Sequence, residues 1–134
     1  MNLVKFLEAA IAASFLASMT DWYFFGVLFH DRYHLHAGVW KKYKNKQDEM
    51  RSILIGTLFG SFTCIIFVAG CMILKITALP LALSTAAFLW LMIPLPLLLT
   101  QSVFMKYDRG LMAAHSGGWL AKLLVAAVCV GLIH

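Results

Sequence analysis

Charged residues are scarce in this chain of 134 residues. It has 11 basic and 6 acidic side chains, so charged residues make up 13% of the sequence and hydrophobic residues 62%. A soluble domain carries about 25% charged residues. A chain of this length buries about two-thirds of its surface on folding, which would leave much apolar surface in water. The composition therefore excludes a soluble domain and predicts an integral membrane protein.

Signatures of common enzyme sites are also missing. The sequence contains no Gly-x-Ser-x-Gly motif, no glycine-rich phosphate-binding loop and no HExxH motif. The aromatic residues lie mostly in apolar segments and not on a basic surface, so nucleic acid is excluded as a partner. A small membrane enzyme with Asp21 and His115 as acid and base is left as a third-ranked hypothesis. These absences favour a non-enzymatic role.

Four apolar segments are long enough to cross a bilayer, which requires about 20 residues of helix. They cover residues 6–29, 52–74, 79–104 and 111–133. Backbone polar groups in lipid must be satisfied within the segment, and the alternation of a β-barrel is absent, so we expect helices. The short connections favour antiparallel neighbours. We predict one domain over residues 1–134, an all-α, four-transmembrane-helix antiparallel bundle running up-down-up-down, with a polar basic loop at 30–51.

The distribution of basic residues predicts the orientation in the membrane. Lys5 and Lys75 lie at the end of the bundle that carries the termini. The opposite end holds eight basic residues, namely Arg32, Lys41, Lys42, Lys44, Lys46, Arg51, Lys106 and Arg109. We therefore expect a multi-pass protein of the cell inner (plasma) membrane, with loops 30–51 and 106–109 cytoplasmic and both termini outside. The lipid bilayer, with its anionic headgroups, is the expected partner.

Two ionisable residues interrupt the apolar segments at depth. Asp21 is expected about 12 Å inside the cytoplasmic interface and Lys122 about 16 Å inside, at 1.5 Å per residue. Charged groups at such depths are costly and usually face the bundle interior or a wet cavity. The difference in depth, about 4 Å, is within reach of a lysine side chain, so an ion pair between them is geometrically possible and would reduce both desolvation costs. His115 lies seven residues before Lys122, on the same helix face. The three residues form the candidate site for a small solute, a proton or an ion, and a static hydrogen-bonded network is the alternative.

A second polar cluster, His30-Asp31-Arg32-Tyr33-His34-Leu35-His36, follows the first segment. In a helix, His30 and His34 share a face at the spacing that can hold a metal ion. His30, His34 and His36 are therefore candidate metal ligands. The other interpretation, which we favour, is an ordinary membrane-interface segment. We accordingly expect no cofactor and keep a metal ion as the alternative.

Small residues recur at intervals of four, which lets helices approach closely in lipid. These are Ala10, Ser14 and Ser18, then Gly56 and Gly60, then Ala114 and Gly118. They indicate packing within the bundle or a homodimer seam. The cysteines, Cys64, Cys71 and Cys129, are interpreted as small packing residues.

Two prolines predict a kink in the third segment. Pro94 and Pro96 each remove a backbone donor from the helix. Trp90 precedes them in mid-segment and is expected to be a packing residue. The kink is either a matter of shape or a means of opening a cavity.

The order of these features resembles a known family. The first segment ends DWYFFGVLF and is followed by Gly38-Val39-Trp40, and the last begins GLMAAHSGGWLAKLL. With four segments in about 130 residues, the chain resembles the small bacterial integral membrane family called domain of unknown function 1761. The matching positions are Trp22, Tyr23, Gly26, Leu28, Phe29, Trp40 and the turn from His115 to Trp119. The resemblance implies a four-helix membrane fold and no particular activity.

Three functions are open at this point. The first is a small protein that binds or translocates a solute, proton or ion through a polar pocket at Asp21, His115 and Lys122. Because four short helices rarely enclose a pathway, this function predicts a homodimer or larger assembly. The second is an accessory subunit of a larger membrane complex, in which the polar residues are structural. The third is a membrane-embedded enzyme or a metal-binding protein.

Overall fold

The computed structural model describes residues 2–31, 38, 43–105 and 108–133. These residues form helices and no strands. The elements are α1 (Leu3–Asp21), the π-helix η1 (Trp22–Leu28), α3 (Lys46–Ile73), α4 (Leu79–Met92), α5 (Pro94–Phe104) and α6 (Arg109–Ile133). They make four helical stretches long and apolar enough to cross a membrane, Leu3–Leu28, Lys46–Ile73, Leu79–Phe104 and Arg109–Ile133. The predicted all-α four-helix bundle is confirmed.

Polar caps set the beginnings of two helices. Asn2 Oδ1 accepts a hydrogen bond from the Lys5 backbone N–H at 2.9 Å and caps α1. Asn45 caps α3 in the same way, with its Oδ1 2.8 Å from the Asp48 backbone nitrogen. Each cap satisfies a backbone donor that the helix leaves unpaired. Helix α3 therefore begins at Lys46, so its first turns lie within the segment predicted as a polar loop.

The predicted kink in the third apolar segment is confirmed as a helix break. Helix α4 ends at Met92 and α5 begins at Pro94, with Ile93 at φ −119° and ψ −71° between them. Proline lacks a backbone N–H and its ring clashes with the preceding turn, which explains the position of the break. The two halves stay in contact with each other and both pack against α6.

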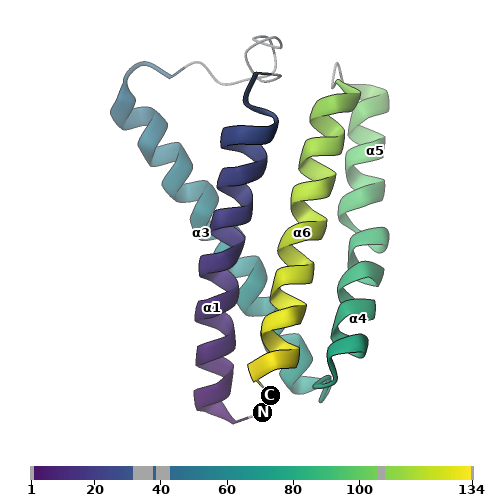
Figure 1. Cartoon of the computed structure of the whole chain (residues 1–134). Helices are drawn as coiled ribbons and strands as arrows, with labels where there is room; N and C mark the ends of the chain where they lie inside the picture. The colour runs from purple at the N-terminus through teal and green to yellow at the C-terminus, as the bar shows by residue number, and fades with distance from the viewer. Residues whose placement is uncertain (1, 32–37, 39–42, 106–107, 134) are drawn as a thin grey trace.

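Helix α6 occupies the centre of the bundle. The largest packing interfaces join α6 to α1, α6 to α4 and α1 to α3, and smaller ones join α6 to α3 and α5. Helix α3 crosses the bundle diagonally, so its N-terminal half leans away from the other helices (Figure 1). The start of α1 and the end of α6 lie at the same end of the bundle (Figure 1).

The core is built largely from small side chains. Ala9, Ala13 and Ala17 of α1 are almost completely buried, one residue before the stripe predicted from Ala10, Ser14 and Ser18. The remaining small or aliphatic members of the core cluster include Val68, Ala82, Ala86, Ala126, Ala127 and Val130. The three cysteines are free and buried, as expected for packing residues. Such side chains allow the close helix approach on which packing in lipid depends.

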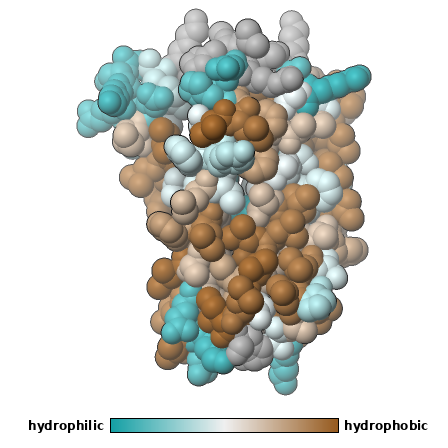
Figure 2. Space-filling model, viewed as in Figure 1, coloured by the Kyte–Doolittle hydropathy of each residue, from teal (hydrophilic) through white to brown (hydrophobic). Residues whose placement is uncertain are grey.

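The outer surface of the bundle is apolar. Figure 2 shows hydrophobic residues across the middle of the molecule, with hydrophilic residues gathered towards its two ends. Large hydrophobic side chains are exposed on every helix, including Phe15 of α1, Phe59 of α3 and Phe88 of α4. An apolar belt between polar ends matches the hydrocarbon core of a bilayer between its two interfaces. The protein is therefore a multi-pass membrane protein.

Candidate functional site

Asp21 and Lys122 form an ion pair between α1 and α6. Lys122 Nζ lies 2.8 Å from Asp21 Oδ2, and the two side chains are only 10% and 22% exposed. The predicted contact between the two residues is thus present. At 2.8 Å the contact is a charge-assisted hydrogen bond, which is shorter and stronger than a neutral one. It compensates part of the cost of removing both charges from water.

Gly60 of α3 makes room for this pair. A Cβ atom built on Gly60 would lie 3.0 Å from Lys122 Nζ and 3.1 Å from Asp21 Oδ2. The pair therefore rests on the backbone of α3, and three helices meet at this point. Gly56, the other glycine of the predicted packing motif, has no atom within 4 Å of such a Cβ. Only one of the two glycines belongs to the site.

Two further features complete the surroundings of the pair. Lys122 Nζ lies 5.1 Å from the centre of the Trp119 ring, within the range of a cation–π interaction. Asp21 Oδ1 is buried and has no hydrogen-bond partner among the residues the structure describes. A buried acceptor without a donor is unfavourable, so this oxygen is the position at which a hydrogen-bond donor would be stabilised.

His115 lies on the same face of α6, two turns from Lys122. Its ring centre is 4.9 Å from that of Phe25, which belongs to the π-helix η1. The neighbouring Gly118 accommodates Phe25, since a Cβ there would lie 3.4 Å from the ring. In the same way Gly117 faces Phe24, at 3.1 Å. The structure therefore brings Asp21 and Lys122 into direct contact, and places His115 against the aromatic residues that follow Asp21.

The π-helix was not predicted from the sequence. It begins at Trp22, directly after Asp21, and Phe29 donates its backbone N–H to the carbonyl of Phe24 at 3.0 Å. A π-helix is rare, and short π segments often occur at functional sites. Here its wider turn follows the acidic member of the ion pair and carries the aromatic rings to α6.

A separate polar contact joins α4 to α6. Trp90 Nε1 donates a hydrogen bond to the backbone carbonyl of Ser116 at 2.9 Å. Ser116 is itself 5% exposed, and its hydroxyl has no partner among the described residues. Trp90 is half-buried and packs against the core as predicted, and its indole N–H is satisfied.

The metal hypothesis rests mainly on residues outside the described part of the chain. His34 and His36 lie there, whereas His30 is exposed just after η1. Among the residues that the structure does describe, no three His, Cys, Asp or Glu side chains are placed to hold a metal ion. The involvement of His30, His34 and His36 therefore stays a prediction.

Sequence reasoning identified the two charges of the site but not the groups around them. Gly60 could be singled out only as half of a small-residue motif, and Trp119 only as the last residue of the turn that resembles the family. Chemically, the arrangement can hold the two helices together, exchange a proton at the carboxylate, or accept a polar group in place of one partner. Each of these roles uses the same contact, so the geometry defines a site without yet selecting its reaction.

Comparison with known proteins places the chain in a family. No curated protein and no solved structure gives a significant match. The model of one family, described as "Protein of unknown function (DUF1761)", matches residues 9–131. The matched region contains α3, α4, α5, the whole π-helix η1 and both residues of the ion pair. The chain therefore belongs to the DUF1761 family of proteins of unknown function.

Proposed function

We propose that this protein binds a small polar solute, a proton or an ion at the Asp21–Lys122 pair within the membrane. The observation that carries the proposal is the buried Oδ1 of Asp21, which lacks a partner among the described residues while Oδ2 is held by Lys122. A proton or a hydrogen-bond donor at Oδ1 would remove this cost. Ionisable groups at membrane depth commonly mark solute pathways or proton relays.

His115 is part of the proposed site, at its cytoplasmic side. It lies on the face of α6 that carries Lys122, and a neutral imidazole offers one hydrogen-bond donor and one acceptor to a passing polar group. A solute or proton that reaches Asp21 from the cytoplasm would pass this residue. Translocation across the whole membrane would further require a homodimer or larger assembly, because four helices packed around small side chains leave little room for a pathway.

Ligand-dependent thermal stability tests the proposed site. The purified wild-type protein and the D21N/K122M double variant are melted with a panel of inorganic ions, amino acids and short organic acids, at several pH values. A ligand at about 100 times its Kd stabilises a protein by about 2.7 kcal/mol, which corresponds to several degrees in Tm. We expect such a shift in the wild type and none in the double variant.

Proton movement is followed separately in liposomes that contain a pH-sensitive dye. A proton site predicts faster dye response with the wild type than with D21N/K122M after a membrane potential is imposed. Equal Tm shifts for both proteins across the panel, together with equal dye response, would contradict the proposal.

The second candidate function is that of an accessory subunit in a larger membrane complex. The tight fit of the pair against Gly60 favours this function, because the two side chains fill the space between α1, α3 and α6 and so contribute to helix packing. In this case the pair only holds α1, α3 and α6 together. D21N/K122M would then keep its cellular function as long as it folds, which separates this function from the first.

For the orientation we propose cytoplasmic loops at 30–51 and 106–109 and both termini outside, from the excess of basic residues in the loops. A membrane-impermeant maleimide applied to intact cells should label L3C, which lies at the exposed start of α1, and should leave K44C unlabelled. The native cysteines are buried and give little background. Labelling of K44C alone would reverse the orientation.

A further inference from the structure

The N-terminal half of α3 stands apart from the rest of the bundle. The first buried residue of this helix is Gly60, although the helix begins at Lys46. Between them, Leu54, Ile55 and Leu58 are 59%, 43% and 61% exposed, and they share the helix face of Arg51 at spacings of three, four and seven residues. Gly56 likewise has no neighbour within 4 Å of a built Cβ. These apolar side chains therefore face a partner other than the protein core.

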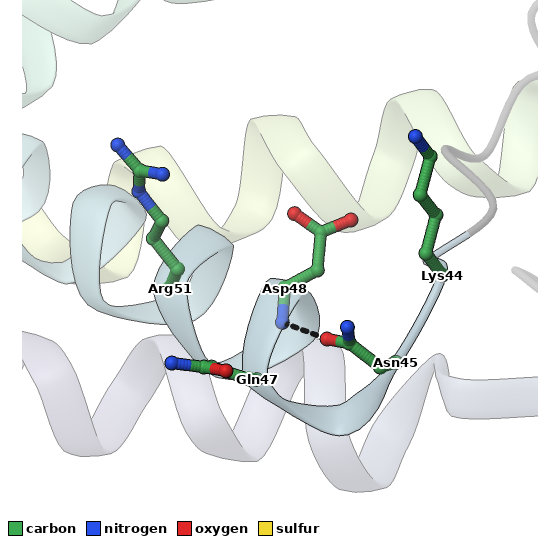
Figure 3. A pocket seen from close by; sticks show the side chains of 5 residues that line it. All are labelled: Lys44, Asn45, Gln47, Asp48 and Arg51. Atoms are coloured by element: carbon green, nitrogen blue, oxygen red, sulfur yellow. Dashed lines mark hydrogen bonds between the residues drawn. The ribbon is translucent and has the colours of Figure 1, made fainter.

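An open polar hollow adjoins this apolar stretch. Its volume is about 550 Å³, and it is lined by Lys44, Asn45, Gln47, Asp48 and Arg51. In Figure 3 the carboxylate of Asp48 lies between the side chains of Arg51 and Lys44. The hollow is at the polar end of the helix, where the apolar run of the sequence begins.

The charges of the lining define the chemistry of the occupant. Two cations and one carboxylate leave a single net positive charge, which matches a group with one negative charge. A guanidinium and an ammonium group both bind phosphate oxygens. The amides of Asn45 and Gln47 can hydrogen-bond to hydroxyl groups. A phosphodiester with a hydroxylated substituent satisfies all of these groups.

We propose that the hollow binds the headgroup of an anionic phospholipid such as phosphatidylglycerol, with the acyl chains along Leu54, Ile55 and Leu58. Both parts of such a lipid then have a counterpart: the phosphate meets the two cations, and the chains cover the apolar residues that no helix covers. A soluble phosphate would contact the hollow but would leave the apolar residues exposed. A second protein could cover the apolar residues, but this would not explain the two cations beside them. The proposal is independent of the function of the Asp21–Lys122 site.

Lipid retention by the purified protein tests the proposal. Native mass spectrometry counts dioleoyl phosphatidylglycerol and dioleoyl phosphatidylcholine bound to the wild type and to K44Q, R51Q and K46Q. Lys46 is the matched control, because it begins the same helix but does not line the hollow. Loss of a direct charge-assisted hydrogen bond to a bound phosphate lowers affinity about tenfold or more. We expect K44Q and R51Q each to lower phosphatidylglycerol retention about tenfold, and K46Q, which makes no such contact, to lower it clearly less.

Three results would overturn the proposal. Equal retention of both lipids by the wild type would show that the apolar face alone binds lipid. An equal loss in K46Q would show diffuse attraction to basic residues. Displacement of phosphatidylglycerol by free sn-glycerol 3-phosphate would identify a soluble phosphate as the ligand. Circular dichroism melts of the variants, whose altered side chains are exposed, verify that each is folded.

Discussion

Removal of either partner of the ion pair is expected to destabilise the protein strongly. In K122M the carboxylate of Asp21 loses its counter-charge, and in D21N the ammonium group of Lys122 loses its counter-charge and keeps a neutral amide and the face of Trp119. Removal of one partner from a buried pair typically costs about 3–5 kcal/mol, because it leaves an uncompensated buried charge. We expect each single variant to melt roughly 10 °C below the wild type in detergent, as measured by circular dichroism or dye-based scanning.

The double variant distinguishes the interaction energy of the two residues from the contribution of each residue alone. D21N/K122M contains no unpaired charge, so we expect it to recover a large part of the stability lost in the single variants. The recovered part is the coupling energy of the two residues. If the losses of the single variants simply add in the double variant, the two side chains do not interact as the 2.8 Å contact requires.

A side chain at Gly60 is expected to separate the pair. The Cβ of G60V would already lie 3.0 Å from Lys122 Nζ and 3.1 Å from Asp21 Oδ2, and its two methyl groups need further space. Inserting atoms into a packed site typically costs about 1–3 kcal/mol. Loss of the ionic contact would add to this cost, so we expect a fall in Tm of several degrees.

G56V is the matched control for this substitution. It places the same residue in the same helix, where no atom lies within 4 Å of the added Cβ. Any intrinsic preference of valine in a helix is common to both variants, so the difference in their Tm reports on the site. An effect of G56V as large as that of G60V would contradict the role assigned to Gly60 and would point to an interface at Gly56.

The sequence by itself determined the class of protein, the number of membrane segments and the two residues at the centre of the site. These conclusions depend on quantities that follow from position along the chain. The thickness of the bilayer and the rise of a helix convert residue number into depth, so Asp21 and Lys122 could be matched before their contact was known. The break at Ile93 follows from local stereochemistry, because Pro94 and Pro96 interrupt any helix.

Only the tertiary structure decided which face of each helix turns inward. It buried Ala9, Ala13 and Ala17 together with Ala10, left Ser14 and Ser18 half-buried, and brought Gly60 rather than Gly56 to the ion pair. It also set the diagonal path of α3 (Figure 1), which brings Gly60 to the ion pair and leaves no residue of α3 before Gly60 buried among the described part of the chain. The sequence could not decide the inward face of each helix because lipid is as apolar as the side chains themselves. Hydrophobicity therefore places a helix in the membrane, but its rotation and its neighbours depend on how closely individual side chains pack.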